Sequence, residues 1–406
     1  MNQEQQAVDA LYKTHFGKMV TAMLQFSRDI DLEMAEDLVQ DAFYAALSTW
    51  KDKGIPDNPA GWTYKVCRNN AINSLKRKNA FKNPFEGDIA IAGTSEQDES
   101  IFDDRKIQLL FACAHPSLSP KMQVVITLKY VANLRAESIS RALGMTIDGI
   151  DKMLARAKQR IKMESLFLKE PSPRQLKMRL PVVHKIIYLI FNEGYRAGSG
   201  KEMIRQELCE ESLIITRSLL DNHISNEDTA ALYALLLFNA ARLSARFTAA
   251  GELSDLEEQD RTLWNSDLIA LGSHYLNQSK IENISCYHYE AAIAYLHCKA
   301  KSFSDIDWTT ISQLYMKLLK DNPNPFIELN YAISLYYDSK KQEAFGLLHH
   351  LQQTFLEQYY LLHAALGKLY LLEGEYHKSE MHLTRALSLT NFQAEKEFIK
   401  KLLLKN

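Results

Sequence analysis

The segment AEDLVQDAFYAALSTW, from Ala35 to Trp50, predicts an amphipathic helix with two different faces. Apolar side chains recur at steps of three and four residues, which places them on one face of an α-helix. They are Leu38, Ala42, Phe43, Ala46, Leu47 and Trp50. A second stripe at the same spacing is acidic and polar, and it comprises Asp37, Gln40, Asp41 and Tyr44. This stripe is either an ordinary solvated face or a surface that contacts a partner.

The composition predicts an all-α protein with more than one domain. The chain has 406 residues, which is long for a single hydrophobic core, so we expect two or three domains. Gly and Pro number only 15 and 10, and a low content of these two residues favours helix. The formal net charge of −2 gives no overall attraction to nucleic acid.

Cysteine usage and hydropathy indicate a cytoplasmic protein. The five cysteines are odd in number and no pair has Cys-x-x-Cys spacing, which argues against a disulfide framework or a zinc site. The opening residues, MNQEQQAVDA, lack the basic and apolar regions of a signal peptide. No apolar run reaches the roughly 18 residues of a membrane helix. We therefore expect no contact with a membrane.

Changes in periodicity divide the chain. Helical patterning over residues 1–82 is interrupted by the loop KDKGIPDNPAG, and an aperiodic acidic segment at 83–104 predicts a flexible linker. A compact helical block follows at 105–168, and EPSPRQ marks a second boundary. Residues 175–406 read as stacked helices with short turns.

The last part of the chain contains an internal repeat. LNYAISLYYDSKKQEAFGLL, from Leu329, superposes on AALGKLYLLEGEYHKSEMHL, from Ala364, with an offset of 35 residues. Small residues then coincide, Ala332 with Gly367 and Ala344 with Ser379. The period resembles the tetratricopeptide repeat, of about 34 residues. The alternative is a generic helical bundle.

A basic segment follows the first loop. From Trp62 to Lys82 the chain carries six Lys and Arg residues and no acid. Cationic side chains bind phosphates, aromatic rings stack on unpaired bases, and amides hydrogen-bond base edges. The candidate nucleic-acid contacts are Trp62, Arg68, Asn69, Asn70, Asn73, Lys76, Arg77 and Lys78. The alternative is a solvated helix face.

A helix-turn-helix is predicted between Glu137 and Lys162. Gly144 supplies the turn, Thr146 or Asp148 can cap the second helix, and Ile150, Leu154 and Ala157 would be its buried positions. Residues 121–162 carry nine positive and three negative charges. The candidate DNA contacts on the second helix are Lys152, Arg156, Lys158 and Arg160.

The order of these pieces resembles an extracytoplasmic-function (ECF) sigma factor of bacterial RNA polymerase. AEDLVQDAFYAAL is similar to the polymerase-binding helix of sigma region 2, and NPAGWTYKVCRNNAINSLKRK to the helix that melts and reads the promoter −10 element. KYVANLRAESISRALGMTIDGIDKMLARAKQRI is similar to region 4, which reads the −35 element. The resemblance covers about residues 8 to 165 and includes no region 3, as in this class.

The resemblance implies a site for each element. Asp37, Gln40, Asp41 and Tyr44 would face the clamp coiled coil of the polymerase β′ subunit, and region 4 would lie at the β flap. The −10 strand would be contacted by Trp62, Arg68, Asn69, Asn70 and Asn73, and its phosphates by Lys76, Arg77 and Lys78. Two departures bear on specificity: Asn73 stands where several members have Asp, and Asp151 faces phosphate unfavourably.

A subgroup of these sigma factors has a long tetratricopeptide-like C-terminal extension, which LPVVHKIIYLIFNEGYRAGSG and LEEQDRTLWN resemble. The resemblance implies regulation through protein contacts, either with a regulatory protein or within the chain. It implies no catalytic residue, metal or cofactor.

Motif searches favour a protein that is not an enzyme. The chain has no His-Glu-x-x-His, no Gly-x-x-x-x-Gly-Lys-Ser/Thr loop and no Gly-x-Ser-x-Gly elbow. His184 lies on an apolar helix and is expected in a core. The remaining alternative is a helix-turn-helix regulator with a tetratricopeptide-like sensor domain that does not bind core polymerase, and such a regulator has no need for the acidic stripe.

Overall fold

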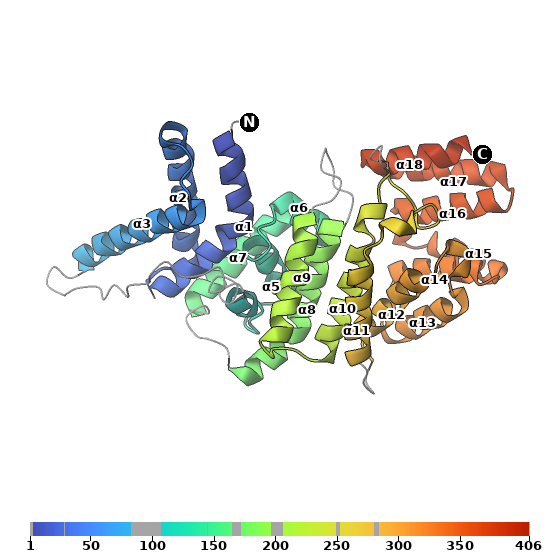
Figure 1. Ribbon diagram of the computed structural model, residues 1–406, viewed down its shortest axis with the longest axis horizontal. Coiled ribbons are helices and arrows are strands. Elements are labelled where there is room, and N and C mark those ends of the chain that lie inside the picture. The colour runs from blue at the N-terminus through green and yellow to red at the C-terminus, as the bar shows by residue number, and fades with distance from the viewer. Residues whose placement is uncertain are drawn as a thin grey trace. The chain divides into compact units, whose positions relative to one another are not determined.

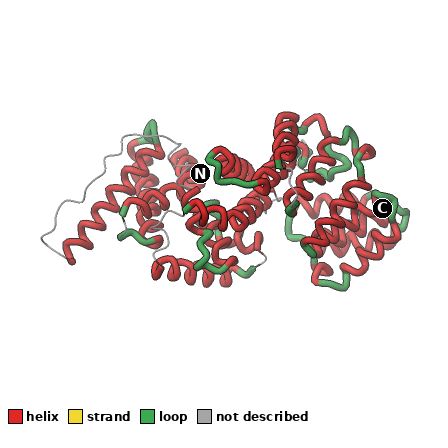
Figure 2. Tube along the Cα trace, turned by 90° about the horizontal axis from the view of Figure 1, so that it is seen from below, coloured by secondary structure: helices red, strands yellow, loops and turns green. Residues whose placement is uncertain are grey.

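The computed structural model describes residues 3–27, 29–82, 107–143, 145–164, 172–195, 206–248, 252–279 and 284–405 (Figure 1). Over these ranges the regular structure is helical, apart from one isolated bridge between Phe247 and Leu253 (Figure 2). The all-α prediction is therefore confirmed. The predicted linker at 83–104 and the turn residue Gly144 lie outside the described residues.

The chain forms two compact units, Met1–Ile190 and Phe191–Asn406. The boundary falls inside helix α8 (Pro173–Tyr195) rather than at the EPSPRQ segment. One contact explains why the start of α8 belongs to the first unit: buried Arg179 donates from Nη1 to the carbonyl oxygen of Phe111, at 2.7 Å. Burial also lowers the pKa of Arg179. His184, on the same helix, is buried as expected.

The first unit begins with three helices, α1 (Gln3–Phe26), α2 (Leu32–Lys53) and α3 (Pro59–Lys82). Asp31 caps α2 by accepting a hydrogen bond from the backbone N–H of Met34, at 2.9 Å. Gly54 ends α2 with a φ of 79°, a conformation that side chains with a Cβ disfavour. The cap at Asp31 and the glycine at position 54 therefore determine where α2 begins and ends.

The second part of this unit contains a helical stretch at 107–113, then α5 (Pro120–Tyr130), α6 (Ala136–Leu143) and α7 (Ile147–Glu164). Thr146 caps α7, because its Oγ1 accepts from the backbone N–H of Gly149, at 3.2 Å. The predicted core positions Ile150, Leu154 and Ala157 are buried. The helix-turn-helix prediction is confirmed in its helices, its cap and its core.

The second unit is a succession of helices in which each packs against the next one along the chain, drawn from green to red in Figure 1. Helix α10 is buried along almost its whole length and packs against α9, α11 and α12. The helices are α9 (Gln206–Asp221), α10 (Glu227–Ala241), α11 (Ser266–Gln278), α12 (Cys286–Lys299), α13 (Trp308–Asp321), α14 (Pro325–Tyr337), α15 (Lys341–Leu351), α16 (Tyr360–Leu372), α17 (Tyr376–Leu389) and α18 (Gln393–Leu404). Short 3-10 turns lie at Leu243–Ala245, Arg261–Leu263, Phe303–Asp305 and Phe355–Gln358.

The predicted repeat corresponds to two helical hairpins, α14 with α15 and α16 with α17. Each helix of the second hairpin begins 35 residues after its counterpart in the first. The small residues have the expected role: a Cβ atom added to Gly367 would lie 2.6 Å from Cγ of Leu383. Close approach of the paired helices therefore requires glycine at this position.

Candidate polymerase and nucleic-acid interface

The acidic stripe of α2 faces solvent. Asp37, Gln40 and Asp41 are exposed, and Tyr44 is 76% exposed. The opposite face is buried as predicted, with one exception. Leu47, which the spacing placed on the apolar face, is 39% exposed, because it lies at the edge of that face beside the stripe. An exposed tyrosine among carboxylates gives α2 both apolar contact area and negative charge.

Negative charge is concentrated at the N-terminal half of α2. The pKa of Asp37 is raised, first by partial burial and then by the neighbouring carboxylates of Glu36, Glu33 and Asp41. Like charges at this spacing disfavour the ionised form. A cationic partner would relieve this repulsion, so the stripe is suited electrostatically to a basic surface.

The residues of α3 that were predicted to contact the −10 element lie on more than one face of the helix. At about 100° per residue, Trp62, Asn69, Asn73 and Lys76 fall within one narrow stripe, with Asn70 and Arg77 at its side. Arg68 lies on the other flank and is half-buried. The ring of Trp62 packs edge-on against buried Trp50, with 5.6 Å between ring centroids. Lys78 follows on the same helix, and its side chain is outside the described residues.

The predicted DNA contacts on α7 also divide by face. Lys152, Arg156 and Arg160 are exposed and follow one another at four-residue steps. Two of them are paired along the helix, Lys152 with Asp148 at 2.7 Å and Arg160 with Glu164 at 2.5 Å. Exposed pairs of this kind contribute little stability. Lys158 lies on a different face.

Lys158 contacts the three-helix part of the unit. Its Nζ lies 2.7 Å from Oε2 of Glu36, and the hydroxyl of Tyr130 donates to the same oxygen at 2.9 Å. Glu36 is 9% exposed and Tyr130 is fully buried. Close by, Nζ of Lys162 lies 2.9 Å from Asp31. The basic end of α7 is therefore paired with acids at the start of α2.

Backbone contacts reinforce this packing. A Cβ atom added to Gly17 would lie 2.1 Å from the carbonyl oxygen of Tyr130, so α1 passes directly against the end of α5. Asn133 donates from Nδ2 to the carbonyl oxygen of Tyr12, at 3.0 Å. This interface was not predicted from the sequence. Its one local signal was Glu36 itself, an acid in line with apolar Val39 and Phe43.

The described residues contain no group of three or more His, Cys, Asp or Glu side chains that could hold a metal ion. None of the helices in the described part is long and apolar enough to cross a membrane.

The first unit thus combines a three-helix part, which carries an exposed acidic stripe and a basic helix, with a helix-turn-helix. The comparisons with known families identify the modules. Residues 11–81 match Sigma-70 region 2, and residues 108–161 match Sigma-70, region 4. Residues 179–280 match a family of unknown function, DUF6596.

One relative is similar along nearly the whole chain. An uncharacterized protein of Rhizobium meliloti (strain 1021) is 29% identical over 388 residues, which cover 93% of this chain and 91% of that protein. No solved structure matches the chain.

The chain thus has an ECF-type sigma architecture, regions 2 and 4 followed by a helical extension that contains the DUF6596 domain. This confirms the resemblance found in the sequence. Regions 2 and 4 imply a sigma factor's role in transcription initiation, through core RNA polymerase and promoter DNA. Sigma factors are not enzymes, in agreement with the motif search.

Proposed function

We propose that this sigma factor binds core polymerase through the stripe of Asp37, Gln40, Asp41 and Tyr44, with the β′ clamp as its partner. The observation that carries the proposal is the exposure of all four side chains, although α7 packs against the start of the same helix. Tyrosine and paired charges are typical of binding hot spots. The stripe is therefore available to polymerase before regions 2 and 4 separate.

Promoter recognition is divided between α3 and α7. On α3, the stripe of Trp62, Asn69 and Asn73 would read the opened −10 strand, while Lys76, Arg77 and Lys78 hold phosphates. Asn70 borders this stripe, and Arg68, which lies on its other flank, would contact the same strand from the side. On α7, Lys152, Arg156 and Arg160 form the face suited to −35 duplex.

Lys158 reaches DNA only after it leaves Glu36. In the structure the ammonium group of Lys158 is paired with the carboxylate of Glu36, and Lys162 is paired with Asp31. A phosphate backbone offers both lysines the same charge complement. We expect region 4 to part from region 2, and to dock on the β flap, when the protein assembles with polymerase and promoter.

The helical C-terminal unit would regulate these steps through protein contacts. Stacked helical hairpins present an extended surface suited to peptides and helices. Two hairpins at a 35-residue offset support this role.

Run-off transcription on genomic DNA with core polymerase tests the proposal. The full-length protein should direct transcription from defined starts. Asp37→Lys with Asp41→Lys should abolish both polymerase binding and RNA, whereas the control Asp9→Lys, on an exposed face of α1, should not. If the double variant still bound polymerase and directed the same amount of RNA synthesis, the stripe would be excluded as the polymerase-binding surface. Tight operator binding without any polymerase binding would favour a regulator instead.

Truncation tests the role of the C-terminal unit. The cut is placed after Tyr195 rather than near residue 170, because α8 supplies the buried Arg179 to the first unit. We expect promoter output to change. Identical promoter output from the whole chain and the truncated chain, in vitro and in cells, would contradict a regulatory role for the C-terminal unit.

A further inference from the structure

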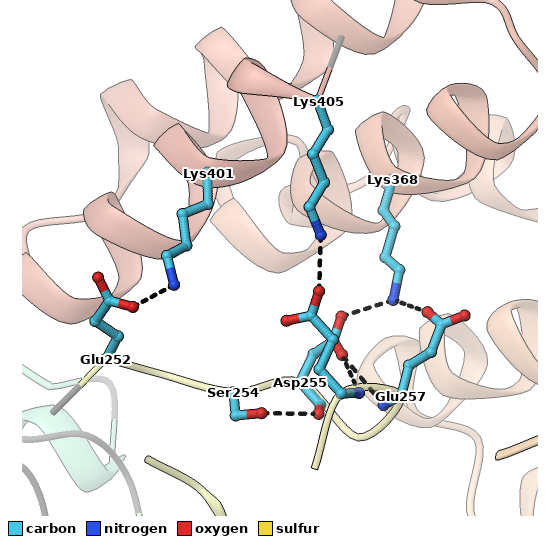
Figure 3. Close-up of polar contacts among 8 residues, drawn as sticks. Glu252, Ser254, Asp255, Glu257, Lys368, Lys401 and Lys405 are labelled. Carbon is cyan, nitrogen blue, oxygen red and sulfur yellow. Dashed lines mark hydrogen bonds and ion pairs between the residues drawn. The ribbon is translucent and has the colours of Figure 1, made fainter. Parts of the chain in front are cut away.

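Four carboxylates of one short segment meet three lysines of the last helices in the second unit (Figure 3). The segment, which we call the acidic loop, comprises residues 252–258. The lysines, which we call the lysine face, are Lys368 on α16, Lys401 on α18 and Lys405 at its end. The acidic loop lies inside the DUF6596 match, and the lysine face lies beyond it.

Lys368 is the centre of the lysine face. Its Nζ lies 2.7 Å from Oδ2 of Asp255 and 2.7 Å from Oε2 of Glu257. The lysine side chain is only 22% exposed. Burial alone would lower its pKa, but Tyr337, Asp255 and Glu257 raise it above the ordinary value. A largely buried ammonium group held by two carboxylates is a cation that requires an anionic occupant.

The two outer lysines make exposed pairs. Lys405 lies 2.7 Å from Glu258, and Lys401 pairs with Glu252. All four of these side chains are between 39% and 57% exposed. Solvent and salt screen such pairs, so they contribute little to the stability of the contact between the acidic loop and the lysine face.

The acidic loop is presented as an irregular peptide. Oδ1 of Asp255 accepts hydrogen bonds from the backbone N–H groups of Glu257 and Glu258, both at 3.1 Å. This turn aims Oδ2 of Asp255 and the side chain of Glu257 at the same ammonium group. The lysine face thus contacts carboxylates at spacings of three, two and one residues on a segment with no regular secondary structure.

We propose that the lysine face is a binding site for acidic protein segments, and that the acidic loop occupies it in the free protein. The lysine face binds several carboxylates that lie close together on a segment without regular secondary structure. An acidic segment of another protein can supply the same set of carboxylates. A segment of the same chain acts at an effective concentration on the order of millimolar. A partner therefore needs at least as many carboxylates to displace it. This proposal names the partner chemistry of the regulatory role proposed above, and rests on that role.

Peptide binding to the full-length protein tests the site directly. The probe is a fluorescein-labelled peptide with the sequence GELSDLEEQD, residues 251–260. In a loop-neutral variant, Glu252, Glu257 and Glu258 become Gln and Asp255 becomes Asn, which still accepts the two backbone N–H groups. Fluorescence anisotropy should show binding at least about tenfold tighter to this variant than to the wild type, because the competitor within the chain has lost its charge.

Two controls separate recognition from general charge attraction. Adding Lys368→Met to the loop-neutral variant should abolish the binding, and a peptide with every acid replaced by its amide should not bind. Circular dichroism verifies that each variant is folded. If the loop-neutral variant is unfolded, Glu257→Gln alone, at an exposed residue, should give a smaller gain of the same sign.

Equal binding to the wild type and to the folded variants, or binding that survives Lys368→Met, would overturn the proposal. So would a short DNA duplex that binds the lysine face when the peptide does not. These binding measurements need no polymerase. Their failure is therefore distinguishable from failure of the transcription experiments.

Discussion

The Nζ atom of Lys158 lies 2.7 Å from Oε2 of Glu36, a residue 122 positions earlier in the chain. The pair joins α7, the basic helix of region 4, to α2, the helix of region 2 that carries the acidic stripe. Tyr130 completes the contact by donating its hydroxyl to the same carboxylate oxygen. Burial and the charge of Glu36 raise the pKa of Tyr130, so the phenol stays protonated and remains a donor.

Glu36→Gln should weaken the contact between regions 2 and 4. The amide can still accept from Tyr130, but Lys158 loses its counter-charge. Because the pair is partly exposed, we expect a loss of about 1 to 2 kcal/mol in the free energy of unfolding of the first unit. Calorimetry measures the loss, and hydrogen exchange should show faster opening of α7. The exposed Glu137→Gln serves as the control, and equal behaviour of the two variants would contradict the prediction.

Gly17→Ala should be destabilising, because the added methyl group meets backbone rather than a movable side chain. The Cβ atom would lie 2.1 Å from the carbonyl oxygen of Tyr130. Relief requires α1 and α5 to separate, at a cost of about 1 to 3 kcal/mol. Gly346→Ala is the matched control, since nothing lies within 4 Å of its added Cβ atom. In that helix alanine should be neutral or slightly stabilising. A similar melting temperature for both variants would count against the close approach.

Polymerase binding should weaken as pH falls toward the raised pKa of Asp37. Burial and neighbouring acids favour the protonated form in the free protein. A basic partner binds the ionised form, so its binding lowers this pKa and releases a proton. Affinity measured from pH 7 downward should therefore decline, and Asp37→Asn should flatten the profile. The same variant should slightly stabilise the free protein at neutral pH. A profile unaffected by the variant would argue against contact at Asp37.

Acidification should destabilise the second unit through His382. Burial, and then His363 and His349, lower the pKa of His382 to about 4. An unfolded histidine has a pKa near 6.5, so between about pH 6.5 and 4 the unfolded chain binds more protons than the folded one. Stability is therefore lost as pH falls through this window. Calorimetry should show a falling transition temperature, with a shallower slope in His382→Gln. An equal slope would assign the effect to other groups.

Much of the local structure could be predicted from residue patterns. The steps of three and four residues place Asp37 and Tyr44 on an exposed face of α2, and Thr146 caps α7 as expected. The 35-residue offset gave the two hairpins, with Gly367 at their closest approach. Errors arose at the edges of helical faces, where Leu47 is exposed. Arg68 and Lys158 show that membership of a basic helix does not decide which face a cation occupies.

The sequence by itself determined the helices, their caps and their charged stripes, since these depend on neighbours within about one turn. Only the tertiary structure decided which charges meet. Lys158 with Glu36, and Lys368 with Asp255, join residues more than 100 positions apart. Such pairs follow from the packing of whole helices, which buries apolar faces and brings distant cations and carboxylates into contact. No spacing along the chain encodes that proximity.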